Sequence, residues 1–147
     1  MSLTLTRSEI EQRIPHRPPF LWIDEVTALD ESRITAKTFL DPAWELFGGH
    51  YPGSPVFPGV LQCEAAFQAG AVLMSQLLEP GSARVPVVTR LNNTQFRQLV
   101  RPGETLTIDV ELTERLANAF LLGGKITVAG KVTCRLEFTV TTVPQIS

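Results

Sequence analysis

Residues Phe47–Gln68 read FGGHYPGSPVFPGVLQCEAAFQ, and this stretch decides how the rest of the chain folds. Its first half is a loop rich in glycine and proline that carries His50, one of two histidines in the chain. Its second half opens an apolar run from Gly59 to Leu78 that contains a single carboxylate, Glu64. A charge inside an apolar helix is costly unless it is paired or used. The stretch therefore predicts acid–base chemistry beside an apolar pocket.

The apolar run from Gly59 to Leu78 predicts one long helix. Pro58 suits the first helical position, because the N–H that it lacks would have no partner there. The sequence Glu-Pro-Gly at residues 79–81 ends the helix. Apolar residues surround the helix axis, whereas several polar residues interrupt the run and no basic residue flanks it. A helix buried on nearly all sides is therefore favoured over a membrane span.

One narrow stripe of this helix differs from the rest. At about 100° per residue, the stripe contains Glu64, Gln68, Ala71 and Ser75. It either serves a functional site or forms a solvent-exposed edge.

The remaining segments alternate apolar and polar residues with a period of two, which is typical of strands joined by short turns in an antiparallel sheet. One face of such a sheet is apolar, and only the long helix can cover it. We therefore predict an α+β fold in which an antiparallel sheet of about six strands wraps around one long central apolar helix. The predicted strands cover residues 20–29, 33–40, 85–99, 106–112, 120–128 and 132–140.

Three smaller features are also predicted. Ser8 caps a short helix over residues 8–13, with Glu11 completing a capping box. One helical turn covers Ala43–Leu46, and the glycine pair at residues 123–124 marks a β-bulge.

Length and composition indicate a single domain over residues 1–147. The formal charge of -2 gives no reason to expect nucleic acid or an anionic membrane as a partner. Cys63 and Cys134 match no metal or redox spacing, so both are interpreted as buried, inert thiols. The first residues contain no apolar segment of signal-peptide length, which predicts a cytoplasmic protein.

His50 and Glu64 are the candidate catalytic pair. An imidazole is mostly neutral at about pH 7 and can take up a proton, which suits His50 to the role of base. Burial in an apolar helix disfavours the charged form of a carboxyl group, which suits Glu64 to the role of acid. A base and an acid in one pocket are suited to an elimination. The free N–H groups of Gly59 and Val60 at the helix start could hold a carbonyl oxygen as it gains charge.

Other chemistries have less support in the sequence. Two histidines without a nearby ligand set argue against a metal site, and no cofactor is expected. The chain has no GxSxG, P-loop or GxGxxG motif. The glycines at residues 48, 49 and 53 are followed by no lysine, so a phosphate loop is rejected.

The segment GHYPGSPVFPGVLQCEAAFQ, residues 49–68, resembles the motif of the β-hydroxyacyl-[acyl carrier protein] dehydratases, which have the hotdog fold. The resemblance extends upstream through IPHRPPFLWIDEV, residues 14–26, and downstream through QFRQLVRPGETLTIDVEL, residues 95–112. It covers nearly the whole chain. It implies a lyase that reversibly removes water from a (3R)-3-hydroxyacyl thioester in fatty acid or related acyl-chain biosynthesis, on acyl carrier protein or coenzyme A.

The same resemblance assigns residues. It implies His50 as the catalytic base, Glu64 as the acid, and the amides of Gly59 and Val60 as the site of the thioester carbonyl. Gln68, on the stripe with Glu64, is expected to contact Glu64 and orient it without contacting the substrate. The glutamate at position 64 resembles the general dehydratase branch. The resemblance also implies a homodimer, or a larger assembly of dimers, in which the histidine and the acid of each site come from different chains.

Two further regions contain arginine; one matches the family pattern and the other departs from it. His16 and Arg17 match it, and we interpret them as structural, tying the N-terminal segment to the body. Gln98, Leu99 and Arg101 depart from it. Because acyl carrier protein is acidic, Arg97 and Arg101 are the candidate docking residues for the carrier, with Arg84 and Arg90 upstream.

Two other functions stay open on sequence grounds. A hotdog thioesterase needs a carboxylate to activate water but has no use for the pair of His50 and Glu64. A non-catalytic acyl-binding subunit has no need to keep either residue.

Overall fold

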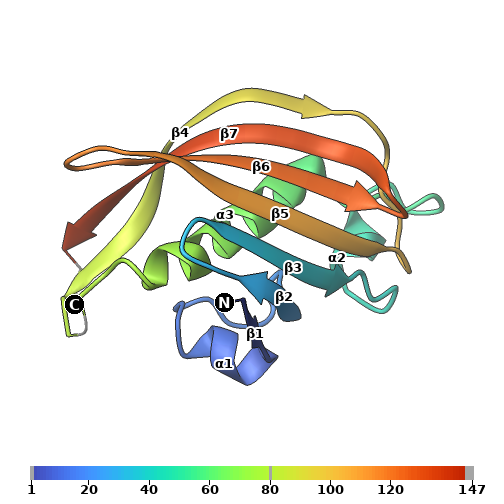
Figure 1. The fold of residues 1–147 in the computed structure, drawn as a ribbon. Coiled ribbons are helices and arrows are strands. Elements are labelled where there is room, and N and C mark those ends of the chain that lie inside the picture. The colour runs from blue at the N-terminus through green and yellow to red at the C-terminus, as the bar shows by residue number, and fades with distance from the viewer. Residues whose placement is uncertain (1, 80, 145–147) are drawn as a thin grey trace.

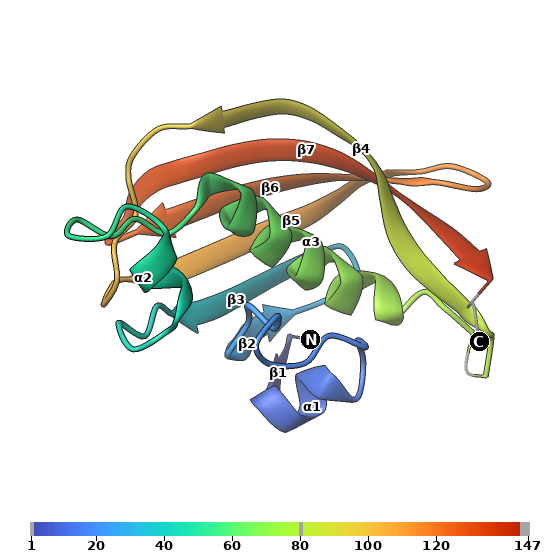
Figure 2. The ribbon, with the colours of Figure 1, turned by 180° about the vertical axis from the view of Figure 1, so that it is seen from behind.

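The computed structural model describes residues 2–79 and 81–144. Seven strands form one antiparallel sheet in the order β1-β2-β3-β5-β6-β7-β4. The helix α3 lies across one face of this sheet (Figures 1 and 2). The strands are β1 (Leu3–Leu5), β2 (Glu25–Leu29), β3 (Arg33–Phe39), β4 (Arg84–Phe96), β5 (Thr105–Arg115), β6 (Phe120–Val128) and β7 (Lys131–Pro144). The helices are α1 (Arg7–Glu11), α2 (Leu46–Gly49) and α3 (Gly59–Ser75).

Helix α3 forms the centre of the core, as the apolar run predicts. Ten of its 17 residues are buried, so it is covered on most sides. Pro58 is its N-cap, and the helix ends three residues before the predicted Leu78. The last turn is tighter than an α-helical turn, since the Leu77 N–H bonds to the carbonyl of Met74, three residues back, at 2.9 Å. Among the described residues, no helix combines the length and apolarity needed to cross a membrane.

The two cysteines lie in this core. Cys63 on α3 and Cys134 on β7 are both buried and free, which confirms the prediction of buried thiols. The neighbouring Cys63 and burial both raise the pKa of Cys134, so its thiol stays protonated.

Gly124 on β6 lets α3 approach the sheet. A Cβ added at Gly124 would lie 2.9 Å from Leu136 Cδ2 and 3.6 Å from the Cβ of Ala66 on α3. Gly123 and Gly124 pair regularly with Glu137 and Leu136 on β7, so the bulge predicted at this pair is wrong. Gly124 leaves room for packing, and neither glycine bends the strand. The register shifts in the pairings of β6 lie between Leu112 and Glu114, and between Ile126 and Thr127.

Differences from the predicted elements lie mainly near the N-terminus. The seventh strand is β1, whose three residues are too few to show a period. Thr6 and Glu9, rather than Ser8 and Glu11, form the capping box of α1. The helical turn predicted at Ala43–Leu46 lies a few residues later, as α2, because the Asp41 side chain accepts the Ala43 N–H in a non-helical turn.

The predicted first strand, residues 20–29, is shorter in the structure. Only Glu25–Leu29 pair as a strand, β2. The Trp22 N–H and the Phe20 carbonyl bond to the side chain of Gln68 on α3, and the Trp22 carbonyl accepts from the Thr38 hydroxyl on β3. The connection between α1 and β2, residues 12–24, therefore packs over the stripe of α3 that contains Gln68.

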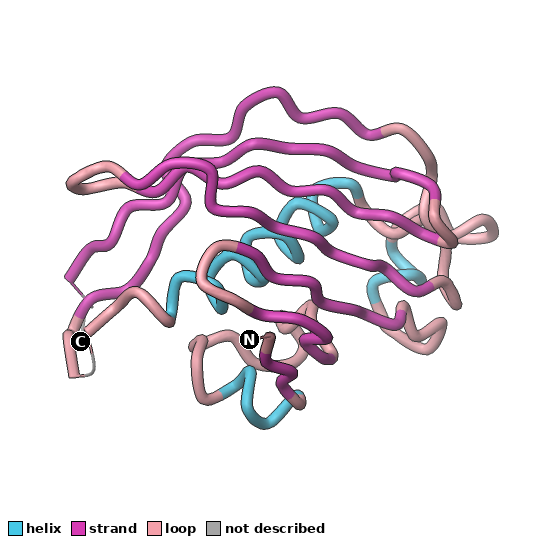
Figure 3. The backbone as a smooth tube through the Cα atoms, viewed as in Figure 1, coloured by secondary structure: helices cyan, strands magenta, loops and turns pink. Residues whose placement is uncertain are grey.

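The two edges of the sheet differ in length and in exposure (Figure 3). One edge is β1, with three residues, and the other is β4, with 13 residues. None of the residues of β4 is buried, and four of its apolar residues, Val87, Val88, Leu91 and Phe96, are more than a third exposed. The β4 edge therefore presents apolar side chains beside unpaired backbone groups.

Candidate active site

His50 stands at the C-terminal end of α2 with one ring nitrogen held by the backbone. Its Nδ1 lies 2.6 Å from the carbonyl oxygen of Val56. A carbonyl only accepts, so Nδ1 carries the hydrogen and Nε2 is left with a lone pair. The loop that brings Val56 back to His50 turns through Tyr51 and Gly53, whose φ angles are 57° and 93°. This arrangement leaves Nε2 ready to accept a proton.

Glu64 lies on the first turns of α3 with its side chain 23% exposed. The Nε2 of Gln68 donates to Glu64 Oε2 at 2.9 Å. Gln68 itself is fully buried, and its orientation is fixed by the backbone of residues 20–22. Its Oε1 accepts from the Trp22 N–H at 2.8 Å, and its Nε2 donates to the Phe20 carbonyl at 2.9 Å. The alternative that this stripe of α3 forms a solvent-exposed edge is therefore excluded at Gln68.

A second histidine, which the sequence reasoning did not place here, approaches Glu64. His16 Nε2 lies 3.8 Å from Glu64 Oε2, while His16 Nδ1 is buried and has no hydrogen-bond partner among the described residues. Burial lowers the pKa of His16, although the charge of Glu64 acts in the opposite direction. His16 is therefore neutral at about pH 7. The P-H-R pattern around residue 16 is the only sequence signal that could have indicated this contact.

Arg17 has the structural contacts that were predicted for it. Its guanidinium donates to the carbonyls of Glu11, Ile14 and His16 at 2.8, 2.9 and 2.7 Å. Its Nε also lies 3.3 Å from Glu11 Oε1. These bonds fix the backbone on which His16 stands.

Within one chain, no hydrogen bond or ion pair in residues 2–79 and 81–144 joins His50 to Glu64. The structure thus gives each candidate its own support but does not pair them. Either a second chain completes the site, or the two residues work apart.

The start of α3 carries the candidate amides. The backbone N–H groups of Leu61 and Gln62 both reach the Pro58 carbonyl, which leaves those of Gly59 and Val60 before the first helical bond. The Val60 side chain is 72% exposed. A Cβ at Gly59 would lie 2.9 Å from the ring of Phe96 on β4. A side chain at residue 59 would therefore have to displace the ring of Phe96, which is 52% exposed.

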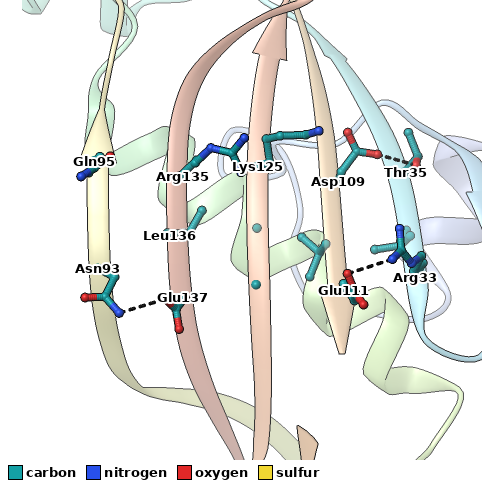
Figure 4. Close-up of a pocket in the computed structure, with 14 residues that line it drawn as sticks. Arg33, Thr35, Asn93, Gln95, Asp109, Glu111, Lys125, Arg135, Leu136 and Glu137 are labelled. Carbon is teal, nitrogen blue, oxygen red and sulfur yellow. Dashed lines mark hydrogen bonds and ion pairs between the residues drawn. The ribbon is translucent and has the colours of Figure 1, made fainter. Parts of the chain in front are cut away.

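Two hollows are present on the described surface. One, of about 590 Å³, adjoins the start of α3 and is mainly apolar; its lining residues are Arg7, Pro18, Pro19, Phe20, Leu21, Trp22, Trp44, Glu45, Leu46 and Leu61. The other, of about 510 Å³, lies on the face of the sheet away from α3 (Figure 4). Its charges offset one another, three cations against three carboxylates: Arg33, Lys125, Arg135, Asp109, Glu111 and Glu137. The apolar hollow reaches the start of α3 through Leu61, but neither hollow is lined by His50, Glu64, Gly59 or Val60.

The candidate docking residues lie between β4 and β5. Arg97 is exposed and donates to Gln95 at 3.1 Å. Arg101 is exposed and donates to the Ser54 hydroxyl at 3.2 Å, so it lies against the loop that follows His50.

Known structures with the same arrangement share the hotdog fold. The dehydratase heterocomplex ApeI:P from Xenorhabdus doucetiae superposes with a TM-score of 0.77 at 15% identity, over 91% of this chain and 90% of that chain. A thioesterase from Haemophilus influenzae superposes with a TM-score of 0.63 at 21% identity, over 84% of this chain and 80% of that chain. At such identities the similarity shows the fold alone.

Relatives found by sequence have higher identity to this chain than these solved structures. A 3-hydroxyacyl-[acyl-carrier-protein] dehydratase FabZ of Enterococcus faecalis is 39% identical over 95% of this chain and 97% of its own. The FabZ of Ligilactobacillus salivarius is 42% identical over 90% of this chain and 94% of its own. The family model for the FabA-like domain matches residues 14–137, a span that contains His16, His50 and Glu64. The chain therefore belongs to the FabA-like family.

Proposed function

We infer that the chain is a 3-hydroxyacyl-[acyl-carrier-protein] dehydratase, a hydro-lyase of fatty acid biosynthesis. It removes water from a (3R)-3-hydroxyacyl thioester to give the trans-2-enoyl thioester, and it catalyses the reverse addition. The observation that carries this conclusion is the similarity to FabZ dehydratases at 39% identity over 95% of the chain.

We propose that His50 and Glu64 carry out the elimination. His50 Nε2, left with a lone pair by the bond of Nδ1 to Val56, takes the proton from C2 of the substrate. The electron pair forms the C2–C3 double bond, and the C3 hydroxyl leaves as water with the proton that Glu64 supplies. A net proton transfer from His50 to Glu64 then restores the starting state. The N–H groups of Gly59 and Val60 donate to the thioester oxygen as it gains charge.

We also propose that two chains form each site. The long, exposed β4 edge carries apolar side chains, and its Phe96 lies against Gly59 at the start of α3. Two β4 edges that pair around a two-fold axis would bring the start of α3 in one chain near the His50 loop of the other. This arrangement accounts for the lack of a contact between His50 and Glu64 within one chain.

The carrier and the location belong to the same proposal. Arg97 and Arg101 are both exposed, and Arg101 lies against the loop that follows His50, which suits docking of an acidic acyl carrier protein. The cytoplasmic location predicted from the sequence stays a proposal, which fractionation of cells that express the tagged chain would test.

Crotonyl thioesters of acyl carrier protein and coenzyme A provide the direct test of the activity. We expect enoyl absorbance to fall as water adds to the crotonyl group, and to rise when the 3-hydroxybutyryl thioester is supplied. Free thiol is measured in the same samples. Release of thiol without a change at the double bond would mean that the chain is a thioesterase, and the dehydratase conclusion would be withdrawn.

A further inference from the structure

The contact between His16 and Glu64 lies outside the pair that the proposed reaction uses. The two residues are far apart in sequence, yet His16 Nε2 is 3.8 Å from Glu64 Oε2. Arg17 holds the backbone of His16 through three carbonyls, so the imidazole is presented by a fixed segment. The contact is therefore built by the fold and does not depend on a mobile surface side chain.

The two oxygens of Glu64 have different surroundings. Oε2 accepts from Gln68 Nε2 at 2.9 Å and faces His16. The Gln68 amide cannot turn round, because its own oxygen accepts from the Trp22 N–H. Among the described residues, no donor or acceptor bonds to Oε1 of Glu64. Oε1 is thus the oxygen that is free to carry a transferable proton.

The tautomer of neutral His16 follows from the same geometry. A hydrogen on Nδ1 would be a buried, unpartnered donor, and the lone pair of Nε2 would then face a carboxyl oxygen. A hydrogen on Nε2 points at that oxygen instead, which is favourable. Two charged groups act on the pKa of His16: Glu64 on α3 raises it, and Arg17 on the same segment lowers it together with burial, which is the largest effect.

We propose that His16 is a positioning residue for Glu64, and that its neutral Nε2–H stabilises the carboxylate that forms when Glu64 gives up its proton. At 3.8 Å in the structure, the contact is longer than a hydrogen bond. The negative charge that develops on Glu64 strengthens the attraction and shortens the contact. An interaction that is stronger in the transition state than in the ground state raises kcat and leaves KM unchanged.

Three variants of His16 test this inference, which rests on the proposed role of Glu64. In His16→Gln, the side-chain amide N–H lies near the position of the imidazole Nε2. In His16→Asn, the amide lies near the position of Nδ1, where it cannot reach Glu64. His16→Leu removes the donor. We expect His16→Leu and His16→Asn each to lower kcat by roughly tenfold, as for loss of one hydrogen bond to a charged group. His16→Gln should recover most of kcat, and KM should stay within about twofold in all three.

Glu64→Gln is measured alongside, with thermal melting of every variant as a check of folding. Equal losses in the Gln, Asn and Leu variants would show that His16 acts through packing or through its own titration, and would overturn the inference. A wild-type kcat in His16→Leu would also overturn the inference about His16. In either case, an inactive Glu64→Gln would leave the proposed function in place. An active Glu64→Gln would remove both the inference and the role of Glu64.

Discussion

At the scale of single residues, the fold treats the two nitrogens of His50 and the two oxygens of Glu64 unequally. Val56 holds Nδ1 of His50, and Gln68 holds Oε2 of Glu64. In each case one atom is used for orientation, and the other remains available for the reaction. Such fixed orientation is what general acid–base catalysis requires.

Replacing His50 with Ala, or Glu64 with Gln, should lower the rate of dehydration by roughly 10²–10⁴-fold, because each removes one proton-transfer group. The measurement is the steady-state rate with 3-hydroxyacyl-carrier substrate, with circular dichroism to show that the fold is intact. A folded variant that keeps nearly the wild-type rate would remove that residue from the mechanism.

His16 should make stability depend on pH. Burial lowers its pKa, so the unfolded chain binds the proton more readily than the folded one. The stabilising effect is complete above the unfolded value of about 6.5 and is lost as pH falls through the lower folded value. The free energy of unfolding of the wild type, measured in urea, should therefore fall more between pH 7.5 and 5 than that of His16→Gln. Parallel curves for the two proteins would contradict the prediction.

At the scale of elements, the main relation is between α3 and the α1–β2 connection, residues 12–24. Gln68 on α3 joins the two by hydrogen bonds to the backbone on both sides of Leu21. Together with the bond from the Thr38 hydroxyl to the Trp22 carbonyl, these bonds supply partners for backbone groups of residues 20–22, which lie outside the strand. The connection in turn carries His16 to Glu64.

Gln68→Ala should destabilise the protein, because it leaves the buried Trp22 N–H and the part-buried Phe20 carbonyl without their partner. At about 1–3 kcal/mol for each of the two groups, the expected loss in unfolding free energy is about 2–6 kcal/mol. Gln76, at the end of the same helix, makes an exposed bond of 2.9 Å to the Asp30 carbonyl and is the matched control. Gln76→Ala should cost less than about 1 kcal/mol. Equal losses in the two variants would show that Gln68 does not tie the connection to α3.

The elements that could be predicted from the sequence are those with a regular period. The apolar run of α3 and the alternation along β5 and β7 are local patterns, so they predict the helix, the sheet and their packing. The contact of His16 with Glu64 joins residues from different elements and leaves no periodic trace. Residues 20–24 look like a strand because they are apolar, but the deciding partner is a side chain on α3. Tertiary hydrogen bonds of this kind override local pattern.

At the scale of the whole molecule, the charge is nearly balanced, and recognition must depend on where charges lie. The net charge is -2, so an acidic carrier is not attracted by the chain as a whole. The loop between β4 and β5 carries two exposed arginines, Arg97 and Arg101, and Arg101 lies beside the loop that follows His50.

Reversing both Arg97 and Arg101 to Glu should weaken turnover of carrier-linked substrate and reduce its dependence on salt, because steering by charge is lost. Turnover of coenzyme A or pantetheine thioesters should be nearly unchanged. Arg115, at the other end of β5, provides the control reversal. If both substrate types lose the same activity, the two arginines are structural and the docking assignment is wrong.

Mixing chains tests whether the site is shared. His50→Ala and Glu64→Gln chains are each inactive by expectation, but a mixed dimer would contain one site with both residues intact. Equal mixing makes half of the dimers mixed, each with one working site of two, so activity should recover to about a quarter of the wild-type level. Exchange of subunits is verified by native mass spectrometry of differently tagged chains. Proven exchange without recovery would rule out the two-chain site.

The unequal edges of the sheet also limit how large an assembly can grow. Two copies that join through β4 use up both long edges, because a two-fold contact consumes the same surface on each copy. What remains outside is β1, three residues long and interrupted by a register shift between Leu3 and Leu5. So short and irregular an edge offers little template for another strand. If two copies join through β4 as proposed, edge-to-edge growth should therefore stop at two copies, so a rise in concentration would add dimers and would not start a filament.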